Sequence, residues 1–199
     1  MLTIRSRGRL PHWEADQAIY FVTFRLADSL PKSVLERFEF ERRDILATAL
    51  AAHRDLSPSE RRRLAELFSE RIESNLDAGA GKCHLAKPRI AAVVADVLRH
   101  FHAVRYWLYA WRVMPNHVHA LFRPFPGHAL AEVLHTWKSY SANRANRLLG
   151  RTGEFWQREY FDHLDRDEQE FYRIVEYILQ NPEKAGLKNW PWVGTALEP

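Results

Sequence analysis

Two histidines in the middle of the chain stand at a spacing that can hold a metal ion. His117 and His119 are separated by one residue within the segment 113–122, which has strand-like alternation. Side chains at positions i and i+2 of a strand point to the same face, so we expect the two imidazoles to lie side by side. Two ordinary histidines on a half-exposed strand are the alternative interpretation.

A later segment carries a phenol and a carboxamide on one face of a predicted helix. Apolar residues within 171–178 fall at helical spacing, and the helix is predicted to end at 181–182, where a proline follows an asparagine. Arg173, Tyr177 and Asn181 follow one another at i+4 steps, so their side chains stack on one face. Tyr177 is the candidate of most chemical interest.

Hydrophobic periodicity predicts the elements that must position these residues. The predicted strands are 18–27, 105–114, 117–123 and 155–164. Three helices are predicted. The first begins at Pro88, the second covers 129–149, and the third carries Tyr177. This order predicts an α+β fold of the ferredoxin-like type, in which a four-stranded antiparallel sheet has helices on one face and a further terminal helix. The histidine strand is then central, and the terminal helix can bring Tyr177 and Asn181 over the imidazoles.

One stretch of the chain has a different character. Residues 32–76 interleave apolar residues at helical spacing with nearly balanced charges, which predicts two helices with a break near Pro58. Ser57 or Ser59 is the predicted N-cap of the second helix. Because 199 residues suit one hydrophobic core, we predict a single domain over residues 1–199 with a helical insertion at about 32–81.

Composition limits the class of protein. The net charge of +4 and the pI near 9.3 are compatible with a polyanionic partner. Cys83 is the only cysteine, which excludes an intrachain disulfide and a cysteine-based zinc site and fits a reducing compartment. No apolar run approaches the roughly 20 residues that span a bilayer, and no signal-peptide core follows Met1. We therefore expect a cytoplasmic protein without a membrane segment.

Basic and aromatic side chains are candidates for contact with nucleic acid. The basic candidates in the N-terminal arm and around the helix at 129–149 are Arg5, Arg7, Arg9, Lys138, Arg144, Arg147 and Arg151. A solvated surface is the alternative for all of them. The candidates for stacking on unpaired bases are Tyr106, Trp107, Trp111, Trp137 and Trp156. Packing in the core is the more ordinary use of so many aromatic residues.

Several motifs resemble one known family. The sequence His117-Val118-His119 resembles the signature of the HUH single-strand nucleases, and the residues 177–182, followed by 184–187, resemble the tail motif of the REP-associated tyrosine transposases. The segments 114–117 and 156–162 are similar to that family as well. The resemblance covers roughly residues 10–31 and 82–190. The stretch at 32–76 departs from the minimal insertion-sequence transposases.

The resemblance implies a metal-dependent, transposase-like endonuclease and strand transferase. Its partner would be single-stranded or hairpin DNA with hairpin-forming repeats, and its intermediate a covalent 5′-phosphotyrosine on Tyr177. A phenol with a reference pKa of about 10 is a poor nucleophile at neutral pH, so it needs a metal ion as Lewis acid. His117, His119 and Asn181 would hold Mg²⁺ or Mn²⁺, and Arg173 and Lys184 are further candidate DNA contacts.

Two other functions stay open from the sequence. The first is a non-catalytic protein that binds hairpin nucleic acid. The second is a metallohydrolase in which His117 and His119 activate a water molecule. The sequence is equally compatible with a monomer and with a homodimer.

Overall fold

The computed structural model describes most of the chain. The described residues are 3–6, 11–14, 18–52, 54, 56–57, 59–60, 63, 72–158, 160–164 and 168–196. Arg7 and Arg9 therefore lie outside the described residues, and of Arg5 only the backbone, in a short strand, is described. The chain divides into two compact units, one formed by Met1–Ala27 with Cys83–Pro199 and the other by Asp28–Lys82.

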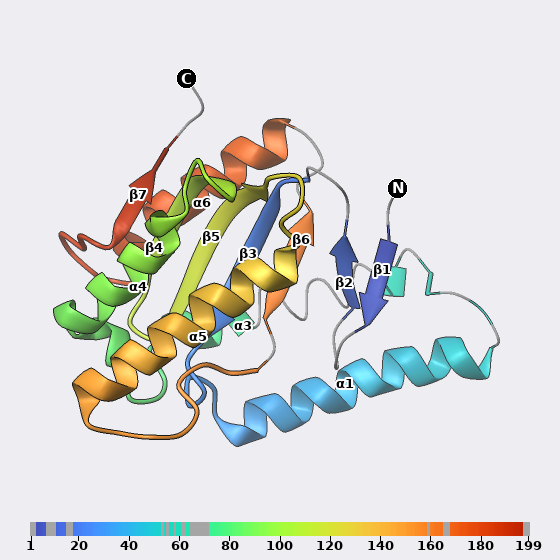
Figure 1. The fold of residues 1–199 in the computed structure, drawn as a ribbon. Helices are drawn as coiled ribbons and strands as arrows, with labels where there is room; N and C mark the ends of the chain where they lie inside the picture. The colour runs from blue at the N-terminus through green and yellow to red at the C-terminus, as the bar shows by residue number, and fades with distance from the viewer. Residues whose placement is uncertain are drawn as a thin grey trace. The chain divides into compact units, whose positions relative to one another are not determined.

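The larger unit is built around an antiparallel sheet (Figure 1). Its strands are β1 (Thr3–Ser6), β2 (Pro11–Glu14), β3 (Tyr20–Arg25), β4 (Tyr106–Val113), β5 (His117–Pro124), β6 (Phe161–Leu164) and β7 (Val193–Thr195). Its helices are the short 3₁₀ helix η2 (His84–Ala86), α4 (Pro88–His100), α5 (Leu130–Leu149) and α6 (Glu168–Lys184). The sheet order is β6-β3-β5-β4-β7, and β1 and β2 pair separately. The predicted ferredoxin-like α+β fold is confirmed, with β5 at the centre.

The sheet has a fifth strand that the sequence analysis did not predict. β7 pairs with β4 through three residues, and Gly194 lies opposite Trp111. A Cβ atom at position 194 would lie 2.8 Å from the Trp111 Nε1 atom, so a glycine is needed for this close approach. A three-residue strand with a central glycine has too little hydrophobic alternation to be recognised from sequence.

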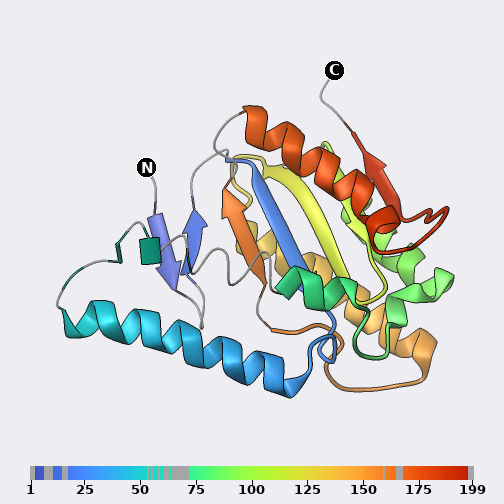
Figure 2. The ribbon, with the colours of Figure 1, turned by 180° about the vertical axis from the view of Figure 1, so that it is seen from behind.

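Two helices cover one face of the sheet and a third helix covers the other. Figure 1 shows α4 and α5 across the near face, and Figure 2 shows α6 across the opposite face. The first face carries the larger core, to which β3, β4, β5, α4 and α5 all contribute. Val175 and Ile178 of α6 instead join a smaller cluster with Phe21 and Leu121. The terminal helix thus lies over the central strands on its own side of the sheet.

Two element boundaries differ from the prediction. The aromatic run at 155–164 forms a strand only from Phe161, because Phe155 and Trp156 insert their side chains into the core instead of pairing along the sheet. Trp156 makes only an isolated bridge with Leu26. α6 continues through Pro182 to Lys184, beyond its predicted end.

The unit Asp28–Lys82 contains the predicted helices of the insertion. Its named helices are α1 (Lys32–Ala51) and α3 (Ile72–Asp77). Ser57 and Glu60 bond reciprocally, since the Ser57 amide donates to Glu60 Oε2 at 2.8 Å and the Glu60 amide donates to Ser57 Oγ at 3.2 Å. This is a capping box, which confirms the predicted N-cap at Ser57. The proline of the predicted break lies outside the described residues. The single-domain interpretation of residues 1–199 stays a prediction.

Candidate active site

The two histidines of β5 lie next to each other in the interior. Both side chains are fully buried, and the centroids of the His117 and His119 rings are 4.7 Å apart. They share the face of the sheet that α6 covers, because Phe21 stacks on His119 at 5.4 Å and belongs to the cluster with α6. The predicted side-by-side arrangement is observed.

Hydrogen bonds orient both imidazoles through their Nδ1 atoms. His117 Nδ1 lies 2.7 Å from Asn116 Oδ1, and His119 Nδ1 lies 2.8 Å from Thr23 Oγ1, its cross-strand neighbour. A carboxamide oxygen only accepts, so His117 carries its proton on Nδ1 and keeps a lone pair on Nε2. The Nε2 atoms of both rings are buried, and that of His119 makes no hydrogen bond to the described residues. This is the arrangement of metal-binding histidines, in which the second nitrogen is held by an oxygen.

The environment keeps both imidazoles neutral. Burial lowers the pKa of His117 and of His119 well below the ordinary value, and the positive charge of Arg112 lowers both further. Arg112 is itself fully buried and stands opposite His119 in the pairing of β4 with β5. Neutral imidazole is the form that binds a metal ion.

α6 brings the predicted nucleophile to this pair. The ring centroids of His119 and Tyr177 are 5.7 Å apart, and Phe21 packs its ring against both. One helical turn later, Asn181 donates from Nδ2 to the Tyr177 hydroxyl at 3.2 Å. The carboxamide of Asn181 is buried. The structure therefore groups His117, His119, Tyr177 and Asn181 on one face of the sheet.

A buried arginine explains why α6 runs through a proline. Pro182 has no N–H to donate to Ile178, the residue four positions earlier. Arg112 Nη1 instead donates to the carbonyl oxygens of Tyr177 at 2.9 Å and Ile178 at 3.4 Å. Its guanidinium carbon also lies 4.4 Å from the centroid of the Tyr177 ring. Arg112 thus keeps the helix continuous at the point where Tyr177 and Asn181 must share one face.

The ligands available for a metal ion here are two histidines and a carboxamide. Within the described residues, no three His, Cys, Asp or Glu side chains are grouped so as to hold a metal ion. A metal ion held by His117 and His119 would therefore need a different third ligand from the protein. The buried Oδ1 atom of Asn181 is the candidate, since its Nδ2 is used by the Tyr177 hydroxyl.

The segment that contains these four residues matches a known family. Residues 84–181 match the family described as transposase IS200 like. This segment is similar to an IS200-like transposase domain. The matched segment begins in η2 and ends at Asn181, so it includes both histidines and Tyr177.

Two known proteins that this chain resembles share one name. A Haemophilus influenzae protein, named as a REP-associated tyrosine transposase, is 37% identical over 51 residues, which are 24% of this chain and 29% of that protein. The solved structure of a REP-associated tyrosine transposase bound to a REP hairpin is similar over 95% of this chain and 82% of that chain, with a TM-score of 0.51 and 15% identity. At that identity the likeness shows a shared fold.

The basic residues predicted to contact DNA are distributed over several elements. Arg144 and Arg147 are exposed on α5, and Arg173 and Lys184 are exposed on α6. Two others already bind carbonyl oxygens: Lys138 Nζ donates to Gln157 and Arg158 at 2.7 Å, and Arg151 donates to Glu154 at 2.9 Å. These two hold the loop that follows α5, so their predicted DNA contacts would compete with structural bonds.

Most of the aromatic residues considered for base stacking belong to the interior of the larger unit. Tyr106, Trp111, Trp137 and Trp156 are buried, so packing is their role. Tyr140 of α5 is 57% exposed and was not among the stacking candidates.

Residues that the sequence analysis missed complete the surroundings of the site. Arg112 had one recognisable signal, because it is a charged residue near the end of a largely apolar strand. Thr23 had no such signal, since a threonine is ordinary in a strand.

No helix in the described part of the chain has the length and apolarity required to cross a bilayer.

Proposed function

We propose that this protein cleaves and rejoins single-stranded DNA through a covalent tyrosine intermediate, as a transposase-like nuclease and strand transferase. The observation that carries the proposal is the grouping of the Tyr177 phenol with two neutral, oriented imidazoles and the Asn181 carboxamide. The names of the relatives support hairpin-forming repeat DNA as the substrate.

In the proposed step the Tyr177 hydroxyl oxygen attacks a phosphorus of the DNA backbone. An O–P bond to tyrosine forms, the P–O3′ bond breaks, and the 3′ oxygen leaves as a hydroxyl group that receives the proton lost by the phenol. The product is a 5′-phosphotyrosine and a free 3′-hydroxyl. Because the phosphotyrosine linkage is again a phosphodiester, rejoining to a 3′-hydroxyl needs no nucleotide cofactor.

His117, His119 and Asn181 fit a divalent cation. The Nδ1 atoms of both rings are held by oxygens, which directs their Nε2 atoms to a ligand, and the lowered pKa values keep both rings neutral. Oxygen ligands from Asn181 and the DNA phosphate suit Mg²⁺ or Mn²⁺. When bound, such an ion polarises the scissile phosphate as a Lewis acid.

Because of Arg112, the affinity of this site for a metal ion should depend on whether DNA is bound. Its buried guanidinium is close enough to both imidazoles to lower their pKa values, so it also repels a cation held between them. A phosphodiester anion offsets that charge. We therefore expect tighter metal binding when single-stranded DNA is present.

Tyr177 and the two histidines come from one chain in this arrangement, which supports catalysis within a single subunit. A monomer is thus sufficient for the proposed chemistry, and a homodimer is compatible with it. We place the protein in the cytoplasm, in keeping with single-stranded DNA as the proposed substrate.

A denaturing-gel assay tests the proposal. Labelled single-stranded hairpin DNA incubated with Mn²⁺ and the protein should give a protein–DNA band that resists denaturant, and a chelator should abolish it. Tyr177→Phe should remove the band while retaining DNA binding. Tyr172→Phe, an exposed tyrosine on the same helix, is the matched control and should retain the band.

Each alternative function has its own outcome in this assay. Cleavage by the Tyr177→Phe variant, with no covalent band from the parent protein, would support the metallohydrolase. Hairpin binding without any cleavage by the parent protein would support the non-catalytic module. Either result overturns the proposed tyrosine chemistry.

A further inference from the structure

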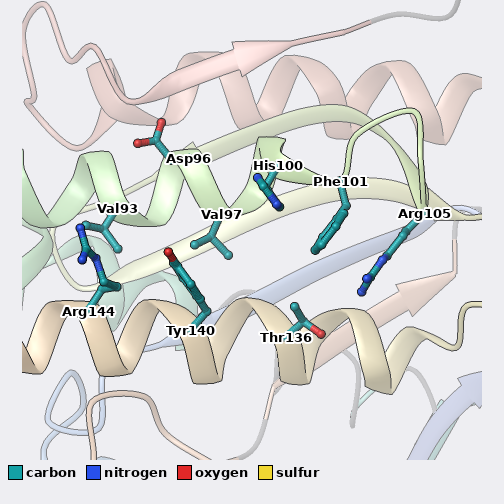
Figure 3. A pocket seen from close by; sticks show the side chains of 9 residues that line it. All are labelled: Val93, Asp96, Val97, His100, Phe101, Arg105, Thr136, Tyr140 and Arg144. Carbon is teal, nitrogen blue, oxygen red and sulfur yellow. The ribbon is translucent and has the colours of Figure 1, made fainter.

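A second concave site lies between α4 and α5, on the face of the sheet opposite to α6 (Figure 3). This α4–α5 groove is defined here by Val97, Phe101, Arg105, Thr136, Tyr140 and Arg144. It encloses about 460 Å³, which is within the usual range of about 300–1,000 Å³ for small-ligand sites. It is therefore large enough for one nucleotide.

The groove has apolar side chains at its base and an exposed aromatic side chain at one side, against which the flat ring of a ligand can pack. Val97 is buried at the base, and Phe101 packs partly against the core of the domain. Tyr140 is 57% exposed, and Figure 3 shows its ring in the space between the two helices. An exposed aromatic side chain beside apolar groups is a surface on which a nucleobase can stack.

Guanidinium groups mark the two ends of the groove. Figure 3 shows Arg144 at one end and Arg105 at the other. The Arg105 guanidinium lies 3.7 Å from the centroid of the Phe101 ring, which restrains it. Asp96 points away from α5 in Figure 3 and is paired with Arg99 at 2.7 Å. The charge presented to a ligand is therefore positive.

We propose that the α4–α5 groove binds an unpaired nucleotide of single-stranded DNA, with its base against Tyr140 and its two flanking phosphates at Arg105 and Arg144. This inference rests on the proposed function and adds a second contact with the same substrate, remote from Tyr177. Thr136 lies on the Arg105 side of Tyr140 in Figure 3. From Thr136 to Arg144, α5 advances by about 12 Å at 1.5 Å per residue, so the groove is long enough for phosphates on both sides of one base.

The observations favour a strand over two other occupants. A free mononucleotide carries phosphate on one side of its sugar, whereas the guanidinium groups stand at both ends of the groove. A DNA duplex keeps its bases stacked inside the helix and exposes no base face to Tyr140. An unpaired residue in a strand has both the free base and the two phosphates.

The test compares binding of a short oligodeoxythymidine with binding of an abasic strand of the same length, measured by fluorescence anisotropy with the full chain. The parent protein should prefer oligodeoxythymidine. Tyr140→Ala should weaken oligodeoxythymidine binding about tenfold, since stacking contributes about 1–3 kcal/mol per base, and should leave abasic-strand binding unchanged. Tyr172→Ala, which removes an equally exposed tyrosine from α6, is the control and should change neither.

A second variant tests the phosphate contact. Arg144→Gln should reduce the slope of log affinity against log salt concentration by about 0.7 for single-stranded DNA. Arg89→Gln removes an exposed charge from α4 outside the groove and should leave the slope unchanged. Thermal unfolding of each variant, followed by circular dichroism, shows whether it retains the fold.

Three results would overturn the groove as a strand site. They are an unchanged preference for oligodeoxythymidine in Tyr140→Ala, an equal loss of affinity for oligodeoxythymidine and for the abasic strand, and competition by thymidine monophosphate as strong as that by the strand.

Covalent-adduct yield at saturating DNA separates this proposal from the proposed function. If the parent protein forms no adduct but its binding depends on Tyr140, the tyrosine chemistry fails and the groove stands. If the parent protein forms the adduct normally but its DNA binding does not depend on Tyr140, the tyrosine chemistry stands and the groove proposal fails.

Discussion

The two faces of the central sheet are built from different kinds of residues. The face under α4 and α5 buries a large cluster made almost entirely of apolar and aromatic side chains. The face under α6 has a small apolar cluster, and Thr23, Arg112, His117, His119 and Asn181 are buried beside it. Burying such polar groups is unfavourable unless they are hydrogen-bonded. One face therefore supplies most of the stability, and the other places reactive groups where water is excluded.

The polar face shows how this fold holds a site whose groups are unfavourable to bury. The positive charge of Arg112 next to two imidazoles is unfavourable by itself, but the hydrogen bond from its guanidinium to the Tyr177 carbonyl oxygen offsets that cost and orients the helix that carries Tyr177. Such an arrangement persists when the surrounding structure determines its geometry. Substitutions on the two faces should accordingly separate loss of stability from loss of function.

The largest effect on stability is expected on the face under α5. Trp137 is almost fully buried, its ring centroid lies 4.7 Å from that of Phe122, and its Nε1 donates to the Tyr106 hydroxyl. Trp137→Ala should reduce the free energy of unfolding by about 3–5 kcal/mol, as measured by urea denaturation. The Mn²⁺ affinity of the folded fraction should stay unchanged. A loss below about 1 kcal/mol would contradict the assignment of stability to this face.

A smaller loss, coupled to function, is expected for Arg112→Met. The variant leaves the carbonyl groups of Tyr177 and Ile178 without their charged donor, so we expect a loss of about 2–4 kcal/mol in unfolding free energy and a decrease in covalent adduct. In a Pro182→Ala background, a backbone N–H becomes available for Ile178, and the cost of Arg112→Met should fall by about 1 kcal/mol. Strictly additive effects in this double-mutant cycle would refute the proposed role of Arg112.

The buried imidazoles should make stability depend on pH. The pKa of each ring is lowered in the folded state, whereas in the unfolded chain it titrates near 6.5. Below pH 6.5 the unfolded chain therefore takes up protons that the folded chain does not. Stability should be fully present above that pH and fall by up to about 1.4 kcal/mol per pH unit for each ring as the pH decreases.

The control for this pH dependence is a histidine on the other side of the sheet. His119→Gln should flatten the fall in unfolding free energy between pH 6.5 and 5, measured by urea denaturation at each pH. His135→Gln, at an exposed position on α5, should leave the slope as it is in the parent protein. Equal slopes in all three proteins would show that the buried rings are not responsible.

The smallest effect is expected from the loss of one oriented hydrogen bond. Thr23→Val removes the hydroxyl next to His119 Nδ1 at nearly constant volume, so stability should fall by about 1 kcal/mol. Mn²⁺ affinity in the presence of DNA should fall about tenfold, as for other residues that orient metal-binding histidines. The control is Thr48→Val, which removes a hydroxyl that donates to the Asp44 carbonyl oxygen within the same helix and should leave Mn²⁺ affinity unchanged.

Local sequence patterns predicted most elements of the larger unit. Period-two and helical spacing identified β3, β4, β5, α4, α5 and α6, because each of these elements is long enough to show its periodicity. β7 was missed because three residues around Gly194 carry no such pattern. The strand expected from residue 155 was too long, since Phe155 and Trp156 have strand-like side chains that the core takes up instead.

Short spacings along the chain already set the chemistry that is present: two histidines at i and i+2, and a tyrosine and an asparagine at i and i+4. These spacings are local, so the geometry of a strand and of a helix suffices to align each pair. The packing of the whole chain brings the two pairs together and places Arg112, from a third element, where Pro182 interrupts the hydrogen bonds of the helix. Contacts between distant segments depend on how the whole core packs, which no short spacing along the chain records.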